Sequence, residues 1–466
     1  MSSPVIWIVF PLIVSIVLIF FNRQRLLTVI LAISTTLLLA VLAWQLEIGE
    51  VIIVGSWVFK IDDLLPVMGR GLLITNADRP KLVLFFMVAA FWFFGALVVD
   101  VPRLFVPLGL GTITVLMAAL TVEPFIYAAL LIEIAVLASV LMLTPLGGKV
   151  GPGVLRFLTY QTLGMLFILL AGWFLTGVDT GTENIKAVVQ VATFLGFGFA
   201  FLLGIFPLHS WIPMLSKESH PYVVSFVFAT LLSVGTLFGL NFINRYPWLQ
   251  ETLNTLDILR FLGVMMIIAG GAWAAFQRHL GSMLGYALIV EIGRTLIVIS
   301  LPSGQMLSYA LLLPRFLSLG VWALALTVLW EHSNKFHFSS VQGMARKFPI
   351  AGAGVILAHF SLAGFPLLAG FPIYLTLWEQ LSNAASFAAF WSILGSVGLM
   401  AGGLRSLAVL VMGPEDLPWP EEERESIFAR ILILVGIVML FVMGLFPQWF
   451  LTMLTSLSMG VETLTP

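Results

Sequence analysis

The sequence predicts an all-α, polytopic membrane protein with about 14 transmembrane helices, arranged as two inverted five-helix repeats that each contain a broken helix. Hydrophobic residues make up 60% of the 466 positions and charged residues only 10%, a composition unlike that of soluble globular proteins. Apolar stretches of about 20 residues, long enough to cross a bilayer, recur along almost the whole chain. Proline and glycine interrupt two of these stretches, and these interruptions indicate the repeats.

Hydropathy places the predicted spans in order along the chain. Their approximate extents are 4–21, 26–46, 81–99, 104–121, 124–145, 155–176, 186–205, 221–242, 257–276, 281–301, 307–330, 349–378, 386–412 and 427–451. The first span has no basic region before it and no small-residue cleavage site, so we interpret it as a retained span. Between the second and third spans, the apolar runs 51–54 and 57–61 flank Gly55 and predict a small surface hairpin.

The stretch 197–225 contains prolines and polar side chains where an ordinary span would be apolar. The predicted helix breaks are Pro207, Pro213 and Pro221. The polar residues beside them are His209, Lys217 and Glu218. Proline removes a backbone donor and clashes with the preceding turn, so a helix stops or kinks there. Two interpretations remain open: a broken helix that lines an ion pathway, or a short polar loop between two spans.

The stretch 349–378 is too long for one straight crossing and predicts a second broken helix. Its predicted break residues are Gly364, Pro366 and Gly370. Each broken helix comes fourth in a block of five spans, so the second block is inverted relative to the first. The predicted organisation is a three-helix segment with a hairpin-like extramembrane loop (1–103), the two repeats (104–242 and 257–412), and an acidic loop with a C-terminal helix (413–466).

Two glutamates lie at bilayer depth, where an ionisable group costs about 2.5–3.5 kcal/mol on insertion scales. Glu133 and Glu291 each occupy the middle of the second span of a block, the pairing that a repeat predicts. One interpretation is a pair of protonatable carboxylates on a transfer path. The other is a pair of neutral, hydrogen-bonded glutamic acids that stabilise helix packing.

Three more polar residues in the second block are candidates for a proton path. Arg294 follows Glu291 by three residues on one helical face, so the two can form an ion pair. Arg315 follows a proline and is expected to contact freed carbonyls or an acid on a neighbouring helix. His359 precedes the second break, where it serves either as a relay or as a merely hydrogen-bonded side chain.

The chain offers few groups for other chemistry. It has no cysteine, which excludes disulfides, thiolate metal sites and iron–sulfur ligation by this chain. The sequence predicts no catalytic centre, no metal site and no cofactor in it. A net charge of −1 gives no electrostatic footprint for nucleic acid. The bias of lysine and arginine among the short loops predicts that both termini lie outside.

The amino-acid sequence at both breaks resembles that of a known family. FPLHSWIP followed by HPYVVS is similar to the broken seventh helix of the antiporter-like, proton-translocating membrane subunits of NADH:quinone oxidoreductase (complex I). The matching positions are Pro207, His209, Trp211, Pro213, Pro221 and Ser225. Three further segments match in order, around Glu133, around Tyr286 and Gly293, and over QGMARKFPIAGAGVILAHFSLAGFPLLAGF. The resemblance covers about 100–415, and Mrp antiporter and membrane-bound hydrogenase subunits share the fold.

The sequence departs from that family where its lysines usually stand. Leu202 occupies the position of the lysine that partners the fifth-helix glutamate, and Ser233 is near the place of a second lysine. Tyr374 follows the second break where the family usually has lysine or glutamate. Glu133 therefore lacks the cation that would modulate its proton affinity.

The resemblance implies a membrane-arm subunit of a complex I-like NADH:quinone oxidoreductase, in or beside the proton path and without a redox centre of its own. The alternatives are a pump-silent scaffold of such a complex, a Mrp-type cation/proton antiporter, or a membrane-bound hydrogenase subunit. NADH, flavin, iron–sulfur clusters and quinone are expected in partner subunits. The expected partners are other membrane subunits, lipid and protons, in the inner (cytoplasmic) membrane of a prokaryote.

Overall fold

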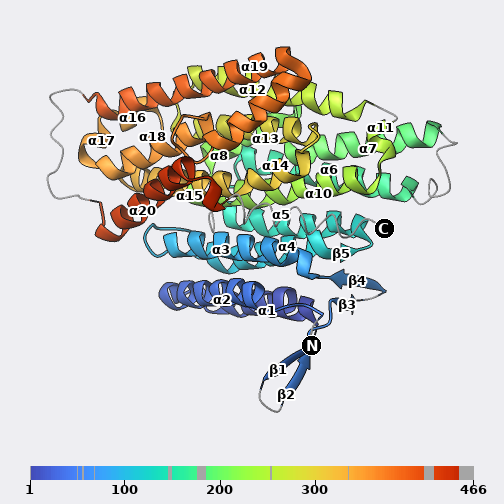
Figure 1. Ribbon diagram of the computed structural model, residues 1–466. Coiled ribbons are helices and arrows are strands. Elements are labelled where there is room, and N and C mark those ends of the chain that lie inside the picture. Colours follow the sequence, from blue (N-terminus) through green and yellow to red (C-terminus); the bar gives the residue numbers. More distant parts are fainter. Residues whose placement is uncertain are drawn as a thin grey trace.

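The computed structural model describes residues 2–49, 51–54, 57–67, 69–144, 149–175, 185–251, 254–333, 335–413 and 425–450. Helices run side by side through most of the molecule (Figure 1). Ten helical segments in the described part of the chain are long and apolar enough to cross a membrane, and three shorter apolar helices accompany them. Together with α3 (Arg79–Gly95) they make the fourteen apolar segments that hydropathy predicts.

The N-terminal segment and the first block contain most of the described helices of the first half of the chain. They are the π-helical turn η1 (Val5–Val9), α1 (Phe10–Phe20), α2 (Arg25–Gln45), η2 (Asn76–Asp78), α3, α4 (Phe105–Thr121), η3 (Phe125–Tyr127), α5 (Ala128–Leu143), α6 (Pro152–Leu175), α7 (Ile185–Leu203), η4 (Leu208–Ser210), α8 (Trp211–Glu218), α9 (Pro221–Val227), η5 (Phe228–Leu232) and α10 (Ser233–Arg245). The segments α9, η5 and α10 together form one crossing.

The second block follows in the chain. Its helices are α11 (Trp248–Glu251), α12 (Thr255–Phe276), α13 (Leu280–Ile299), α14 (Gly304–Ala310), α15 (Leu312–Ser333), α16 (Phe338–Val341), α17 (Met344–Lys347), α18 (Pro349–Ala363) and α19 (Phe371–Val411). The last described helix is α20 (Ile427–Leu445). Most of the predicted acidic loop lies outside the described residues, as does the chain beyond 450.

Both predicted helix breaks are present. The helix α7 ends at Leu203, and Gly204 adopts a positive φ of 63° that few other residues tolerate. The helix α18 ends at Ala363, and Gly364 follows with φ 85°. The backbone is then non-helical or tightly turned before α8 and α19 begin.

One detail of the predicted breaks is wrong. Pro213 lies in the first turn of α8, where its missing N–H is tolerated, so the helix continues through it. The predicted spans 349–378 and 386–412 meet within α19, which consists of two helices joined across a kink just before the predicted start of the second span. Only Ala385 has non-helical dihedrals within α19, with φ −159° and ψ 87°.

Short strands lie at one end of the helices, beside α1 and α2 (Figure 1). The predicted hairpin is confirmed, because β1 (Val51–Val54) and β2 (Trp57–Lys60) pair antiparallel with Val54 opposite Trp57. A three-stranded sheet with the order β3-β4-β5 was not predicted. It consists of β3 (Leu64–Val67), β4 (Arg70–Leu73) and β5 (Val122–Glu123), which follows α4 directly.

Close backbone contacts join the two blocks. The helix α8, which follows the first break, packs on α13 of the second block. A Cβ on Gly285 would lie 2.7 Å from the Cα of Pro213, so the absence of a side chain there permits this approach. The helix α12 packs on α13 and on α19, and α12 and α19 run side by side in Figure 1.

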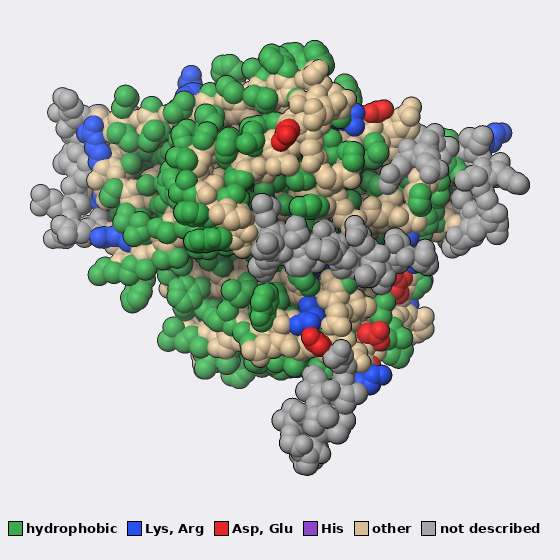
Figure 2. Space-filling model, viewed as in Figure 1, with side chains coloured by type: hydrophobic (Ala, Val, Ile, Leu, Met, Phe, Trp, Pro, Cys, Tyr) green, Lys and Arg blue, Asp and Glu red, His purple; other side chains and the backbone are tan. Residues whose placement is uncertain are grey.

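Hydrophobic side chains dominate the face in Figure 2, and most lysine and arginine side chains lie near its margins. Large apolar side chains such as Trp173 and Phe276, each 78% exposed, would be unfavourable in water. Together with the apolar helices, this surface defines an integral, multi-pass membrane protein.

Candidate functional site

Glu291 lies in the middle of α13, and its side chain is 1% exposed. It is the centre of a hydrogen-bonded cluster beside the second break. Its Oε1 accepts hydrogen bonds from Arg294 Nη1 at 2.6 Å and from the Tyr374 hydroxyl at 2.7 Å. Its Oε2 accepts from Arg315 Nε at 3.3 Å. The carboxylate therefore joins α13 to α15 and to α19, and both of its oxygens are occupied.

Arg294 satisfies the backbone that the break leaves open. Its guanidinium donates to the carbonyl oxygens of Leu362 and Ala363, the last two residues of α18. These carbonyls have no partner within the helix because the helix ends there. The same guanidinium donates to Ser396 Oγ at 2.9 Å and lies 3.9 Å from the ring centroid of Tyr374.

Arg315 completes the cluster from α15. It donates to the Glu291 backbone carbonyl at 3.3 Å and to the Thr295 hydroxyl, in addition to the carboxylate. Two guanidinium groups thus face one carboxylate, which leaves one formal positive charge in a buried site. Buried charges are tolerated only when paired and hydrogen-bonded, and this network supplies both conditions.

His359 lies on α18, one turn before the break, and is fully buried. Its Nε2 donates to the Leu399 carbonyl at 2.8 Å, and its ring stacks on Trp322 at 4.7 Å. Its Nδ1 has no partner among the described residues. The ring is therefore held in place through one nitrogen, and no hydrogen bond in the described part of the chain joins it to Glu291.

In the first block, Glu133 forms no ion pair within the described part of the chain. Glu133 Oε1 accepts from the Thr162 hydroxyl at 2.7 Å, and its buried Oε2 has no partner within the described chain. The side chain of Leu202 is buried, and its carbonyl accepts from Gln161 Nε2 at 2.9 Å. Gln161 thus donates a hydrogen bond to a carbonyl at the end of α7, as Arg294 does at the end of α18. The hydroxyl of Ser233 is buried and unpartnered in the described structure.

The polar residues around the first break take separate roles. His209 is partly buried and stacks on Phe206 at 5.5 Å, and its Nδ1 has no described partner. Glu218 Oε2 accepts the Gly153 backbone N–H at 2.7 Å and so caps the start of α6. Lys217 is exposed and lines a cavity of about 530 Å³ together with Glu218. The structure therefore does not gather these three residues with Glu133.

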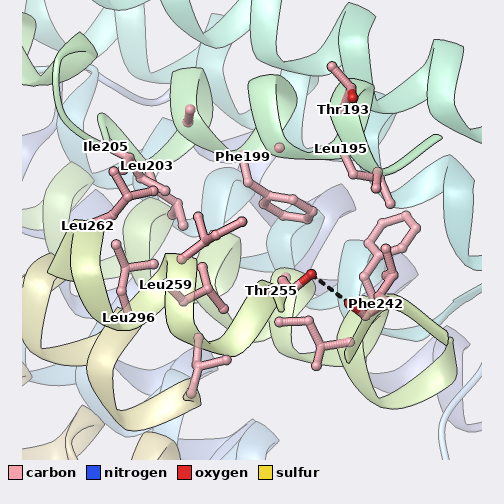
Figure 3. A pocket seen from close by; sticks show the side chains of 18 of the residues that line it. Thr193, Leu195, Phe199, Leu203, Ile205, Phe242, Thr255, Leu259, Leu262 and Leu296 are labelled. Carbon is pink, nitrogen blue, oxygen red and sulfur yellow. Dashed lines mark hydrogen bonds between the residues drawn. The ribbon is translucent and has the colours of Figure 1, made fainter. Parts of the chain in front are cut away.

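A second cavity, of about 350 Å³, lies between α7, α10, α12 and α13 (Figure 3). Its walls are almost entirely apolar. The three threonines that line it, Thr193, Thr236 and Thr255, each donate their hydroxyl to a backbone carbonyl. Among the described residues, no polar side chain that lines this cavity is left without a hydrogen bond.

The sequence prediction missed the side chains that complete both sites. Tyr374 was noted only as a departure from a family pattern, yet its hydroxyl binds Glu291. Thr162, Gln161 and Ser396 are polar residues in apolar helices, and that single signal was available for each. Their partners lie on other helices, so no local pattern identifies them.

Two interrupted helices in corresponding positions and a buried ion cluster at one of them define a class: membrane subunits that carry charged groups at bilayer depth. The transmembrane family described as "NADH:quinone oxidoreductase/Mrp antiporter, TM" matches residues 154–402, more than half of the chain. The chain belongs to this family and is an antiporter-like membrane subunit of the complex I/Mrp type.

Named relatives agree with this assignment. NADH-quinone oxidoreductase subunit 13 of Thermus thermophilus is 27% identical over 68% of this chain and 71% of its own length. NAD(P)H-quinone oxidoreductase chain 4 of Thermosynechococcus vestitus is 25% identical over 71% of this chain and 64% of its own. The chain therefore spans about two thirds of the length of these relatives.

Solved structures share the fold. A chain of the Mrp complex from Dietzia superposes with a TM-score of 0.82 at 17% identity, over 98% of this chain and 96% of that one. A chain of respiratory complex I from Thermus thermophilus superposes with a TM-score of 0.74 at 20% identity, over 98% and 100%. At these identities the likeness shows the fold alone.

Proposed function

We propose that this chain is a membrane-arm subunit of a complex I-like NADH:quinone oxidoreductase, placed in or beside the path by which protons cross the membrane. The names of its relatives support this assignment, as do the two broken helices. The chain itself supplies no catalytic centre. NADH, flavin, iron–sulfur clusters and quinone belong to partner subunits, and other membrane subunits flank this one.

The observation that carries the proposal is the shared carboxylate of Glu291. It lies between Arg294 and Arg315, so a small shift toward either guanidinium would strengthen one ion pair and weaken the other. Because Arg294 also holds the end of α18, such a shift couples to the break itself. Moving charge at a helix break provides a physical means to open and close a proton path.

A second candidate, a pump-silent scaffold, is favoured by the first block. Among the described residues Glu133 has only a threonine hydroxyl as partner, and Leu202 occupies the position at which the family usually has a lysine. A carboxylate without a nearby cation loses the Coulomb interaction that partner charges could use to move its proton affinity. The shared fold also keeps a Mrp-type antiporter or a membrane-bound hydrogenase subunit among the alternatives.

Substitution of the two glutamates in the native assembly tests the proposal. Glu291→Gln keeps the size of the side chain but removes the charge, so proton translocation per electron transferred should fall at least about tenfold if the cluster conducts. Glu133→Gln tests the first block in the same way. Glu379→Gln, which changes an exposed glutamate, is the matched control and should change nothing.

The readout is donor-driven acidification of sealed vesicles, with electron transfer measured on the same membranes. Assembly is checked on native gels, because Glu291→Gln leaves two guanidiniums unpaired. If the complex fails to assemble, Arg315→Lys keeps the charge while removing the planar guanidinium that donates to both Glu291 and Thr295. Pumping at the normal ratio in both glutamate variants would leave only the scaffold role.

We also propose that the chain lies in the inner membrane of a prokaryote with both termini outside. The positive-inside rule supports this orientation, since the loops with Arg103, Lys217 and Arg278 then face the cytoplasm. Accessibility of single cysteines introduced at Ser2 and Lys217 to an impermeant reagent distinguishes the two orientations. The native chain has no cysteine to interfere.

A further inference from the structure

We infer that the cavity beside Lys217 and Lys335 binds a phosphate-bearing anion, the phosphodiester headgroup of an anionic membrane lipid. The cavity measures about 530 Å³ and opens between the end of α8 and the loops that precede α4, α13 and α16. Neither Glu133 nor Glu291 lines it. The inference is independent of proton translocation.

The wall of the cavity is a fixed framework. Leu280 N–H donates to the Phe336 carbonyl at 3.0 Å, and Phe338 N–H donates to the Arg278 carbonyl at 2.9 Å. These bonds form an isolated antiparallel bridge between His279 and His337. Two loops that are distant in sequence are thereby held together, so their side chains present one preformed surface.

The charges at this surface favour an anion. Lys217 and Lys335 are exposed, and neither forms an ion pair within the described part of the chain. Among the described residues of the wall, Glu218 carries the one carboxylate, and this carboxylate already caps the N-terminus of α6. Two lysines against one glutamate leave one formal positive charge, which matches the single negative charge of a phosphodiester.

His279 adds a directed donor. Its Nδ1 accepts the Ser282 backbone N–H at 3.2 Å, so the hydrogen of the neutral ring resides on Nε2. Burial lowers the pKa of His279 to about 4, and the positive charge of Lys217 contributes. The ring is therefore a neutral hydrogen-bond donor at pH 7, and the nearby positive charge of Lys217 helps to keep it neutral.

The apolar part of the wall points to a lipid. Trp330 and Phe336 lie beside the lysines, and Met142 and Leu143 end the membrane-spanning α5. Tryptophan is enriched at the level of lipid headgroups, and basic pockets between transmembrane helices bind such headgroups. A free phosphate ion would contact the lysines but leave the apolar wall uncovered, whereas a lipid covers both.

The test uses the full-length chain, purified and delipidated in detergent. Binding of phosphatidylglycerol, phosphatidylcholine and inorganic phosphate is measured by native mass spectrometry. The double variant Lys217→Gln/Lys335→Gln is compared with the wild type. Lys149→Gln is the matched control, because this exposed lysine precedes α6 near the same surface but does not line the cavity.

We expect one tightly bound phosphatidylglycerol whose Kd rises at least tenfold in the double variant and stays unchanged in Lys149→Gln. Phosphatidylcholine should bind at least tenfold more weakly than phosphatidylglycerol to the wild type. Equal phosphatidylglycerol affinity of the double variant and the wild type would overturn the site. Competition by millimolar inorganic phosphate that fully displaces the lipid would show that aqueous phosphate is the ligand, which overturns the lipid assignment.

Discussion

Tyr374 is the partner of Glu291 that can be altered with the least change in shape. In Tyr374→Phe the ring stays under the Arg294 guanidinium and only the hydroxyl is lost. Hydrogen bonds to charged groups contribute about 1.5–3 kcal/mol, so we expect the unfolding free energy to fall by about that amount. Thermal unfolding of the purified chain in detergent measures it.

Tyr160→Phe is the matched control for that substitution. Tyr160 is partly buried, and its hydroxyl makes no hydrogen bond in the described part of the chain. It should leave the unfolding midpoint almost unchanged. Equal effects of the two substitutions would mean that the Tyr374 hydroxyl contributes nothing specific to the cluster.

Sequence spacing predicted one part of this cluster and could not predict another. Arg294 lies three residues after Glu291, which places both on one helical face, and the ion pair is confirmed. Arg315 was expected to contact a carbonyl or an acid, and it contacts both. Tyr374 lies 83 residues from Glu291, and only the packing of α19 on α13 brings them together.

Among the helices, the breaks were predictable because proline and glycine act locally. Gly364 and Gly204 take the left-handed conformation that few other residues tolerate, and each lies at the end of its helix. The two spans predicted on either side of 379–385 correspond to the two helices that join across the kink at Ala385 within α19. The strands β3 to β5 are two to four residues long, too short for an alternating pattern to show.

The close packing of α12 on α19 predicts that a side chain added at their contact lowers stability. A Cβ on Gly271 would collide with the Gly395 carbonyl, whose carbon would lie 2.7 Å away. Backbone cannot move aside as a flexible side chain can, so Gly271→Ala should lower stability by about 1–3 kcal/mol. The measurement is the thermal unfolding midpoint in detergent.

Gly196→Ala provides the comparison for Gly271→Ala. Gly196 is also helical, but nothing lies within 4 Å of a Cβ built there. Alanine has the higher helix propensity, so this variant should be neutral or slightly more stable. A similar loss of stability in both variants would show that helix propensity or insertion, rather than the α12–α19 contact, is responsible.

Across the whole molecule, hydropathy predicts the number of spans but not which of them touch. The helix α8 from the first break packs on α13, the helix that carries Glu291. The helix that follows the first break therefore contacts the second block directly. This contact depends on Gly285 meeting Pro213, a pair 72 residues apart that no local pattern connects.

Two partly buried histidines in the loops also make the stability of the whole chain depend on pH. His220 and His279 lie between transmembrane segments, and burial lowers the pKa of each to about 4 from an ordinary 6.5. Between these values the unfolded chain binds protons that the folded chain does not, so stability is complete above pH 6.5 and falls as the pH drops toward 4.

We therefore expect the unfolding midpoint of the delipidated chain to decrease between pH about 6.5 and pH about 4, and His220→Gln/His279→Gln to reduce that decrease. Glutamine at 220 keeps an N–H that can donate to the Asp100 carbonyl, as His220 does at 2.9 Å. The variant thus separates loss of the titrating ring from loss of the contact. An unchanged pH dependence in the double variant would assign the acid sensitivity to other groups, because neither histidine would then contribute to it.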